Sequence, residues 1–198
     1  MRILVVSHNV FSETESMGKT LVSYFKDFGQ ENLAQFYIHS EIPTSDICNN
    51  YYRVTDKEMI KSVFGFKTGK VLSENDIQKD RKTSRTDSGT EAKLYQKARK
   101  RTPLIYILRN LWWKLGHWNN KQFRTWIDKI NPDCIFFVSG DYAFMYDIAL
   151  KTAKSRNIPL YVSCMDDYYF NNKNNGKFLG GFQYKHFMKS VNKAMSYS

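Results

Sequence analysis

The segment from Asn131 to Tyr169 constrains the fold more than any other part of the chain. Its apolar run at 134–138 contains no polar residue, which is typical of a parallel strand covered on both faces. A polar turn at 139–141 follows, and apolar residues then recur at helical spacing. A second apolar run occupies residues 158–162. The pattern predicts two parallel strands joined by a helix.

The N-terminal residues repeat this arrangement. Residues 2–7 form an apolar run rich in β-branched side chains, and a helical pattern extends from about Met17 to Phe28. Leu33 to Ile38 forms the next predicted strand. A strand, a crossover helix and a second strand favour parallel pairing. We therefore predict an α/β chain, a single Rossmann-like three-layer α/β/α domain with a mainly parallel sheet.

The middle and the end of the chain add less regular elements. The pattern predicts a short strand at 51–54, a short helix at 56–64 and a polar, basic insertion at about 73–101. Pro103 begins a helical stretch, and Gly116 separates it from a second helix that ends near Ile130. A loop at 171–181 precedes a final helix, whose apolar stripe contains Phe187, Val191 and Met195.

Composition limits the compartment and the chemistry. The 198 residues are 42% apolar and include 14 Phe, 13 Tyr and 4 Trp, enough for a sizeable core. No apolar run approaches the roughly 20 residues that span a bilayer, and the N-terminal run is too short for a signal peptide. These features favour a cytoplasmic protein. The three cysteines lack metal-ligand spacing, so neither a metal site nor a disulfide is expected.

A net charge of +11 favours anionic partners. The strongest basic cluster precedes a tryptophan-bearing helix, a combination that suits an interfacial helix beside anionic lipid. The candidate membrane-contact residues are Lys97, Arg99, Lys100, Arg101, Trp112 and Trp113. The alternative is a core helix behind a charged loop, with its apolar stripe covering the sheet. Nucleic-acid binding is not expected, because no recognised binding motif accompanies the charge.

Polar residues follow the predicted strands, where ligands bind in open α/β sheets. The candidate substrate-binding residues are His8, Asn9, Gly18, Asp141, Asp166, Asp167 and Tyr168. Asp141 could instead cap the next helix. Adjacent side chains of an extended segment point apart, so only one of Asp166 and Asp167 is expected to face the site.

The sequence Gly18-Lys19-Thr20 suggests a phosphate-binding loop at a helix start. That motif needs a glycine five residues before the Gly-Lys pair, where this chain has Glu13. Two further interpretations of this segment are kept: a plain structural loop, and a loop that closely approaches a sugar or diphosphate. A nucleotide- or phosphate-binding module at 16–20 is kept as an alternative function.

The layout resembles the N-terminal, acceptor-side lobe of retaining GT-B glycosyltransferases, the family of bacterial capsule and lipopolysaccharide sugar transferases. Residues 2–8 resemble that family's opening strand, Gly18 the small residue of the first loop, and 131–135 its Pro-Asp-led strand. Residues 157–168 resemble the next strand with its acidic and aromatic end, and 192–198 the helix that leads into the crossover between lobes.

The resemblance implies a hexosyltransferase-type activity that moves a sugar from a nucleotide-sugar donor to a glycan or lipid-linked acceptor. It implies hydroxyl and phosphate contacts at the candidate residues, retention of configuration, and no obligatory metal or further cofactor. The family's donor lobe is missing from these 198 residues, so the isolated chain is expected to be inactive. The expected partners are the acceptor, a donor lobe and an anionic surface at the inner face of the membrane. A non-catalytic interaction domain is a further alternative.

Overall fold

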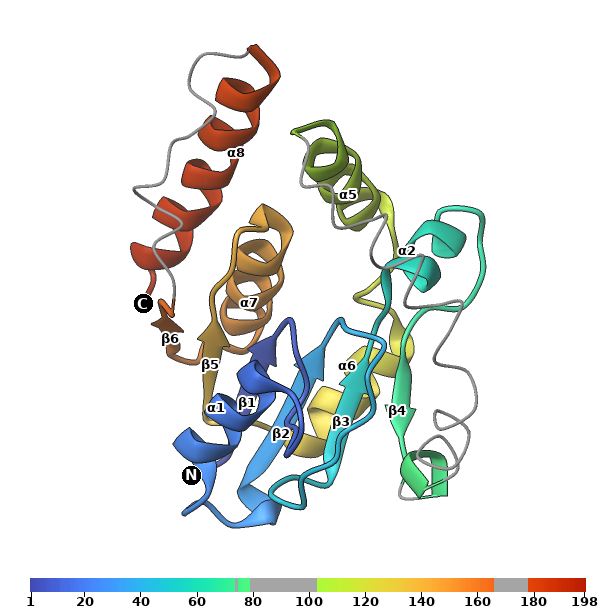
Figure 1. Ribbon diagram of the computed structural model, residues 1–198, viewed down its shortest axis with the longest axis vertical. Helices are drawn as coiled ribbons and strands as arrows, with labels where there is room; N and C mark the ends of the chain where they lie inside the picture. The colour runs from blue at the N-terminus through green and yellow to red at the C-terminus, as the bar shows by residue number, and fades with distance from the viewer. Residues whose placement is uncertain (74, 79–102, 166–177) are drawn as a thin grey trace.

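The structure, a computed structural model, describes residues 1–73, 75–78, 103–165 and 178–198. Its centre is a six-stranded sheet in the order β4-β3-β2-β1-β5-β6 (Figure 1). The strands are β1 (Ile3–Ser7), β2 (Leu33–Tyr37), β3 (Asn50–Arg53), β4 (Lys70–Leu72), β5 (Cys134–Val138) and β6 (Leu160–Ser163). All neighbouring strands are parallel except β3 and β4.

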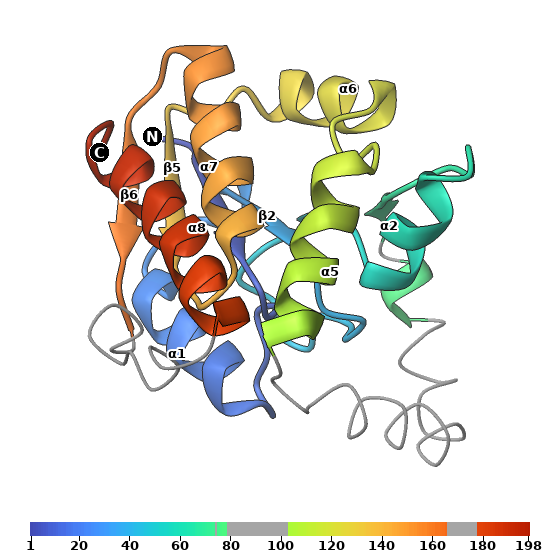
Figure 2. The same cartoon turned by 90° about the horizontal axis from the view of Figure 1, so that it is seen from above.

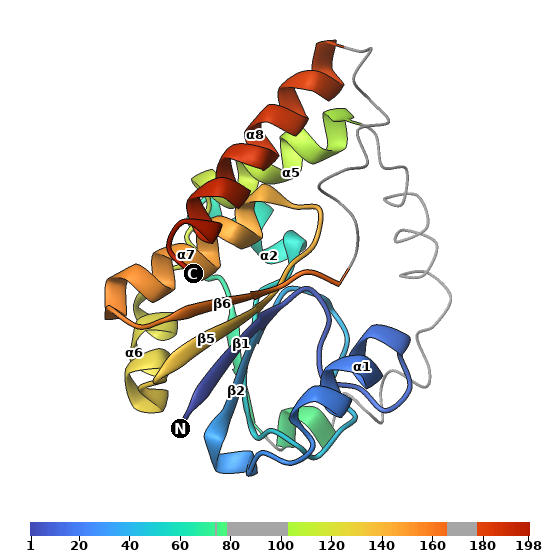
Figure 3. The ribbon, with the colours of Figure 1, turned by 90° about the vertical axis from the view of Figure 1, so that its left-hand side faces the viewer.

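Helices cover both faces of the sheet and complete the predicted three layers. They are α1 (Ser16–Phe25), α2 (Asp56–Ser62), α5 (Pro103–Leu115), α6 (Lys121–Ile130), α7 (Ala143–Arg156) and α8 (Phe178–Met195), with a 3-10 turn at Gln30–Asn32. Figure 3 shows α1 on one face, and α6, α7 and α8 on the other. Each face has its own buried cluster, because central strands present alternate side chains to opposite sides.

The aromatic residues are divided between these two cores. On the α1 face, Phe25 packs edge-on against Phe11 and Phe136, with ring centroids 5.9 and 5.1 Å apart. On the other face, Trp126 lies 5.3 Å from the Tyr52 ring, and Trp118 is also buried. Full burial of a large apolar side chain contributes roughly 1.5 to 3 kcal/mol. Aromatic packing on both faces therefore fixes which side of the sheet each helix covers.

The predicted parallel sheet is confirmed, but two local predictions differ from the structure. Strand β4 was not predicted, because three residues at a sheet edge give too little alternation to detect. Helix α8 begins at Phe178, inside a segment predicted to be a loop, and includes Gly180 and Gly181. Packing of its buried Phe187 against Tyr146 of α7 outweighs the low helix propensity of glycine. Most of the predicted insertion, 79–101, lies outside the described residues.

Helix α5 faces the opposite way from the core-helix interpretation, in which its apolar stripe covers the sheet. The exposed fractions of Leu104, Leu108, Leu111 and Leu115 are 54, 37, 45 and 54%. The inward face instead carries Trp113, which is 2% exposed, together with polar side chains. The core-helix interpretation is wrong because helical periodicity identifies a stripe but not the side on which neighbouring elements lie. None of the helices in the described ranges has the length and apolar character needed to cross a bilayer.

The connections change direction at one edge of the sheet. The chain leaves β1 toward α1 on one face and leaves the neighbouring β5 toward α7 on the other face (Figure 3). The loops after these two strands therefore separate. Open α/β sheets bind ligands beyond the strand ends at such a switch in direction. The strand-end region around His8 and Asp141 is called the crevice below. His8 directly follows β1, and Asp141 lies in the loop between β5 and α7.

Candidate functional site

His8 lies against side chains from α5, from the segment after β2 and from the loop before α7. Its Nε2 is 3.5 Å from Nη2 of Arg109, and its ring lies 5.5 Å from His39 and stacks 6.1 Å from Tyr142. Loss of hydration, together with the Arg109 charge and His39, lowers the pKa of His8 to about 3. The imidazole is therefore neutral near pH 7. Because a guanidinium only donates, Nε2 is the acceptor, and this contact assigns the ring proton to Nδ1.

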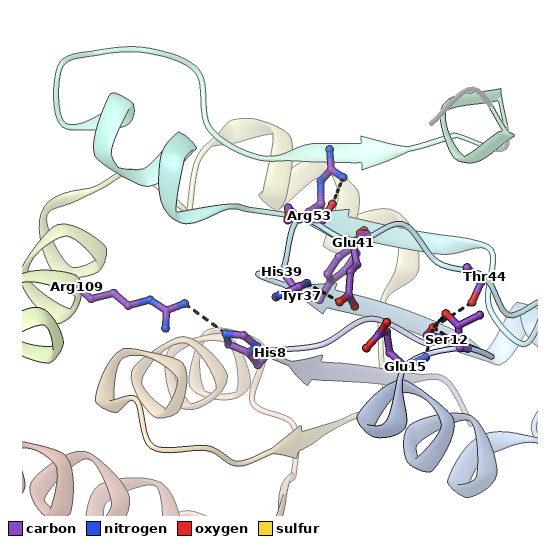
Figure 4. A network of polar contacts seen from close by, with 11 residues as sticks. His8, Ser12, Glu15, Tyr37, His39, Glu41, Thr44, Arg53 and Arg109 are labelled. Atoms are coloured by element: carbon purple, nitrogen blue, oxygen red, sulfur yellow. Dashed lines mark hydrogen bonds and ion pairs between the residues drawn. The ribbon is translucent and has the colours of Figure 1, made fainter. Parts of the chain in front are cut away.

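Arg109 of α5 is held by a carboxylate and by an aromatic ring. Its Nε donates to Oδ1 of Asp56 at 3.0 Å, and its guanidinium carbon lies 3.9 Å from the centroid of the Tyr142 ring. Trp113 donates from Nε1 to the same Asp56 oxygen at 2.7 Å. Burial lowers the pKa of Arg109, but Asp56 and Tyr142 outweigh it, and the resulting pKa lies above its usual value. The site therefore contains a fixed positive charge beside the His8 ring (Figure 4).

Asp141 belongs to the same crevice, but it does not cap the following helix. Its carboxylate accepts a hydrogen bond from the Tyr106 hydroxyl of α5. The N-cap residue of α7 is Tyr142, which makes no side-chain capping bond. Asn110 of α5 takes that role instead, since its Oδ1 accepts from the backbone N–H of Phe144 at 3.1 Å. The inward face of α5 thus orients the loop after β5.

The ends of β2 and β3 add a second group of polar side chains beside the group formed by His8 and Arg109. His39 Nδ1 lies 3.2 Å from Oε1 of Glu41, and the backbone N–H of His39 donates to the His8 carbonyl at 3.0 Å. Arg53 donates from Nη1 to the Ser40 carbonyl at 3.1 Å (Figure 4). Within the described residues, Glu41 Oε2 and Arg53 Nε are buried polar atoms without a hydrogen-bond partner. A ligand with hydroxyl groups could satisfy such atoms.

A buried glutamine holds the loop after β1. Gln35 donates from Nε2 to Ser7 Oγ at 2.8 Å and to the Asn9 carbonyl at 3.0 Å, and its Oε1 accepts from the Phe11 N–H at 3.0 Å. These bonds satisfy the amide on both sides and fix the loop that carries His8 and Asn9. The predicted site residue Asn9 is partly exposed at this edge.

Gly18 has a structural reason to be glycine. A Cβ atom there would lie 2.4 Å from the Ser12 Cβ and 2.8 Å from the Val10 carbonyl oxygen. The loop itself approaches Gly18 closely, which requires a glycine here whether or not a ligand binds. Ser12 Oγ also accepts from the N–H groups of Thr14 at 3.2 Å and Glu15 at 3.1 Å. These contacts favour the structural-loop interpretation over a phosphate loop.

The remaining predicted residues divide into two groups. Asp166, Asp167 and Tyr168 lie outside the described residues, as do Lys97, Arg99, Lys100 and Arg101. Trp112 is partly exposed, whereas Trp113 stacks on Phe144 with ring centroids 4.5 Å apart. Burial of Trp113 removes it from the residues that could contact a membrane. The residues that the sequence did not reveal are Asp56, His39, Tyr106, Tyr142 and Arg109.

The chemistry of this crevice favours binding over proton transfer. A histidine with a pKa near 3 is a weak base at neutral pH, but it remains a hydrogen-bond donor and acceptor. In the part of the chain that the structure describes, no three His, Cys, Asp or Glu side chains are grouped to hold a metal ion. Comparisons with protein-family models, curated proteins and solved structures found no match to this chain.

Proposed function

We propose that this chain is the acceptor-side lobe of a sugar transferase and that it binds the acceptor at the crevice after β1 and β5. The observation that carries the proposal is the convergence of His8, Arg109 and Asp141 on the point where the connections change direction. Ligands of open α/β sheets bind at this point. The resemblance of the sequence layout to GT-B transferases supplies the reaction class.

The side chains suit a hydroxyl-rich ligand that carries a negative charge. A neutral imidazole and a carboxylate offer both donors and acceptors to sugar hydroxyls. The Tyr142 ring supplies an aromatic face, and the Arg109 guanidinium above it supplies a fixed cation. Arginine pairs well with planar or tetrahedral oxyanions, because its N–H groups form a fork. An acidic sugar or a sugar linked through a diphosphate fits this combination.

The second part of the proposal is a peripheral position on the inner face of the membrane. The leucine stripe of α5, consisting of Leu104, Leu108, Leu111 and Leu115, is exposed. In the sequence it directly follows the basic cluster at 97–101. Exposed apolar side chains next to cations bind anionic lipid through both burial and charge. The opposite face of the same helix carries Arg109. A lipid-linked acceptor would therefore reach the crevice from the membrane surface on which the leucine stripe rests.

Calorimetric titration tests the acceptor site. The ligands are hexoses, hexuronic acids and a short-chain lipid diphosphate sugar, each added to the full chain. We expect binding by the charged ligands and about a tenfold loss of affinity in Asp141→Asn, because a hydrogen bond to a charged group contributes roughly 1.5 to 3 kcal/mol. Asp27→Asn, a substitution in the exposed turn that follows α1, is the matched control and should bind normally.

Two results would contradict the acceptor site. One is the absence of binding by every sugar ligand. The other is tight ATP binding that Lys19→Ala abolishes and Asp141→Asn leaves intact, which would support the phosphate-binding module instead.

Sedimentation with vesicles containing about one-third anionic lipid tests the membrane part, at low salt where surface attraction is greatest. We expect retention that is lost in Leu111→Glu. Tyr24→Glu, at an exposed aromatic residue of α1, should be retained like the parent protein. Equal retention of both variants, or none of the parent protein, would overturn a lipid contact through α5.

A further inference from the structure

A groove between α7 and α8 lies apart from the crevice at the strand ends. The two helices run side by side (Figure 2), and the groove between them has a volume of about 860 Å³. Its lining includes Leu150 and Met188, which lie on facing sides of the two helices. From Tyr184 to Ser196 the groove follows α8 and the residue after its C-terminal end for about 18 Å, or roughly three helical turns.

The rims of this groove are strongly basic. The five lysines that line it are Lys151, Lys154, Lys185, Lys189 and Lys193, and all five are exposed. The only acidic residue in the lining is Asp147. Helix α8 contains no aspartate or glutamate, and among the described residues none of the five lysines forms an ion pair with a carboxylate.

Folding alone does not account for this row of lysines. Lys185, Lys189 and Lys193 are spaced four residues apart, so they neighbour one another on the helix surface. Like charges at this spacing destabilise a helix, and acidic residues at alternate positions would relieve the repulsion. The inner face of the helix secures α8 through Phe187 and Val191, both buried. These lysines therefore lower the stability of α8 compared with uncharged side chains at the same positions.

We propose that this groove binds an acidic amphipathic helix of a partner protein. A third helix would place an apolar stripe on Leu150, Tyr184 and Met188, while its flanking carboxylates meet the lysines of both rims. Methionine suits such a surface, because its flexible side chain adapts to different apolar partners. This surface and the acceptor crevice are independent, so either proposal can fail without the other.

The shape and the type of cation favour a helix over a lipid surface. A concave groove about three turns long accepts a rod, whereas a bilayer presents a broad face. All five cations are lysines, which act as point charges and lack the planar fork with which arginine grips phosphate. Carboxylates spaced along a helix need only point charges at matching intervals.

Fluorescence anisotropy with a synthetic peptide tests the proposal. The probe is a labelled helix of about 18 residues, with leucine at helical spacing and glutamate on both flanks. A peptide of the same composition in scrambled order retains the charge but lacks the apolar stripe. We expect the ordered peptide to bind the full chain. Substitution of Lys185, Lys189 and Lys193 by Glu should weaken binding at least about tenfold, because each exposed pair contributes modestly.

Two controls separate the groove from general attraction to a basic protein. Substitution of Lys26, Lys61 and Lys129 by Glu changes the net charge equally, at exposed positions on other elements. This variant should bind the peptide like the parent protein. A peptide with lysine in place of glutamate should bind the groove variant and not the parent protein, which also shows that the variant is folded.

The proposal would be overturned if the scrambled peptide bound as tightly as the ordered one, or if both triple variants lost the same affinity for the ordered peptide. Either result would mean that net charge alone attracts the peptide. Retention on anionic vesicles that is lost in the groove variant alone would overturn it in favour of a lipid surface.

Discussion

Helices α5 and α6 are neighbours in the chain, yet they turn their apolar residues in opposite directions. Helix α6 buries Phe123, Trp126 and Ile127 against the sheet and turns its charged residues outward. Helix α5 exposes its leucine stripe and directs Arg109 and Trp113 inward. The first arrangement is what folding requires. The second places Arg109 and Tyr106 beside His8 and Asp141, and on the proposed function this face of α5 serves the acceptor site instead of the core.

The two helices should differ most in how much free energy of unfolding is lost when a large side chain is removed. Trp126→Ala in α6 removes ring contacts with Tyr52 and Phe123 and should lower the free energy of unfolding by about 3 to 5 kcal/mol. Leu111→Ala in α5 should lower it by less than about 0.5 kcal/mol, since that side chain is 45% exposed. Denaturant titration of both variants measures the difference. Similar losses would mean that the leucine stripe is part of the core.

The inward face of α5 should make stability depend on pH. The pKa of His8 in the folded chain is about 3, compared with about 6.5 when unfolded. Between these values the unfolded chain binds more protons, so the free energy of unfolding falls as the pH falls below 6.5. From pH 6.5 to 5 the loss through His8 should reach up to about 2 kcal/mol.

Urea titrations at several pH values would measure this loss, and His8→Gln should show a shallower dependence over the same window. An identical slope in the variant would mean that His8 is hydrated like an exposed histidine.

The two helices also differ in the carboxylates beside them. Asp56 accepts hydrogen bonds from Arg109 and Trp113 of α5, and Asp56→Asn should cost about 1 to 2 kcal/mol because the Arg109 cation loses its counter-charge. Asp128 of α6 pairs with Arg156, but its side chain is 69% exposed. Asp128→Asn should therefore change stability by less than about 0.5 kcal/mol. Thermal unfolding of the Asp56→Asn and Asp128→Asn variants measures the two losses of stability. A larger loss in Asp128→Asn would contradict this prediction.

The start of α6 provides the smallest test. Asn120 accepts from the Phe123 N–H at 3.0 Å and donates to the Thr68 carbonyl at 2.6 Å. Asn120→Ala should lower the free energy of unfolding by about 1 kcal/mol, the usual effect of removing such a cap. Asn120→Asp, which keeps the capping oxygen, should recover part of the loss. No change in either variant would indicate that the cap is not used in solution.

Much of the fold could be predicted from the sequence, because strands covered on both faces have uninterrupted apolar runs. The run at 134–138 coincides with β5, and the N-terminal pattern gave the parallel pair of β1 and β2. The orientation of α5 could not be predicted, since a stripe of leucines indicates a helix without indicating its neighbours.

The candidate site was only partly predictable for a related reason. His8 and Asp141 were found because they follow predicted strands. Arg109 is 101 positions from His8 and lies within a helix, so nothing in its sequence surroundings marks it as a site residue. The sequence also cannot distinguish a glycine needed by its own loop from one needed by a ligand, and at Gly18 the structure shows the first of these needs.

The most direct measurement is the location of the bound sugar ligand. Nitrogen-15 NMR of the full chain follows the Arg109 side-chain Nε–H group and the backbone amides of residues 8–9 and 139–141 as a lipid diphosphate sugar is added. If α5 and the strand ends form the acceptor site, these signals should shift together in a saturable manner, and those of Ser16 to Thr20 should not. Shifts confined to residues 16–20, or none at the Arg109 side chain, would contradict an acceptor site beneath α5.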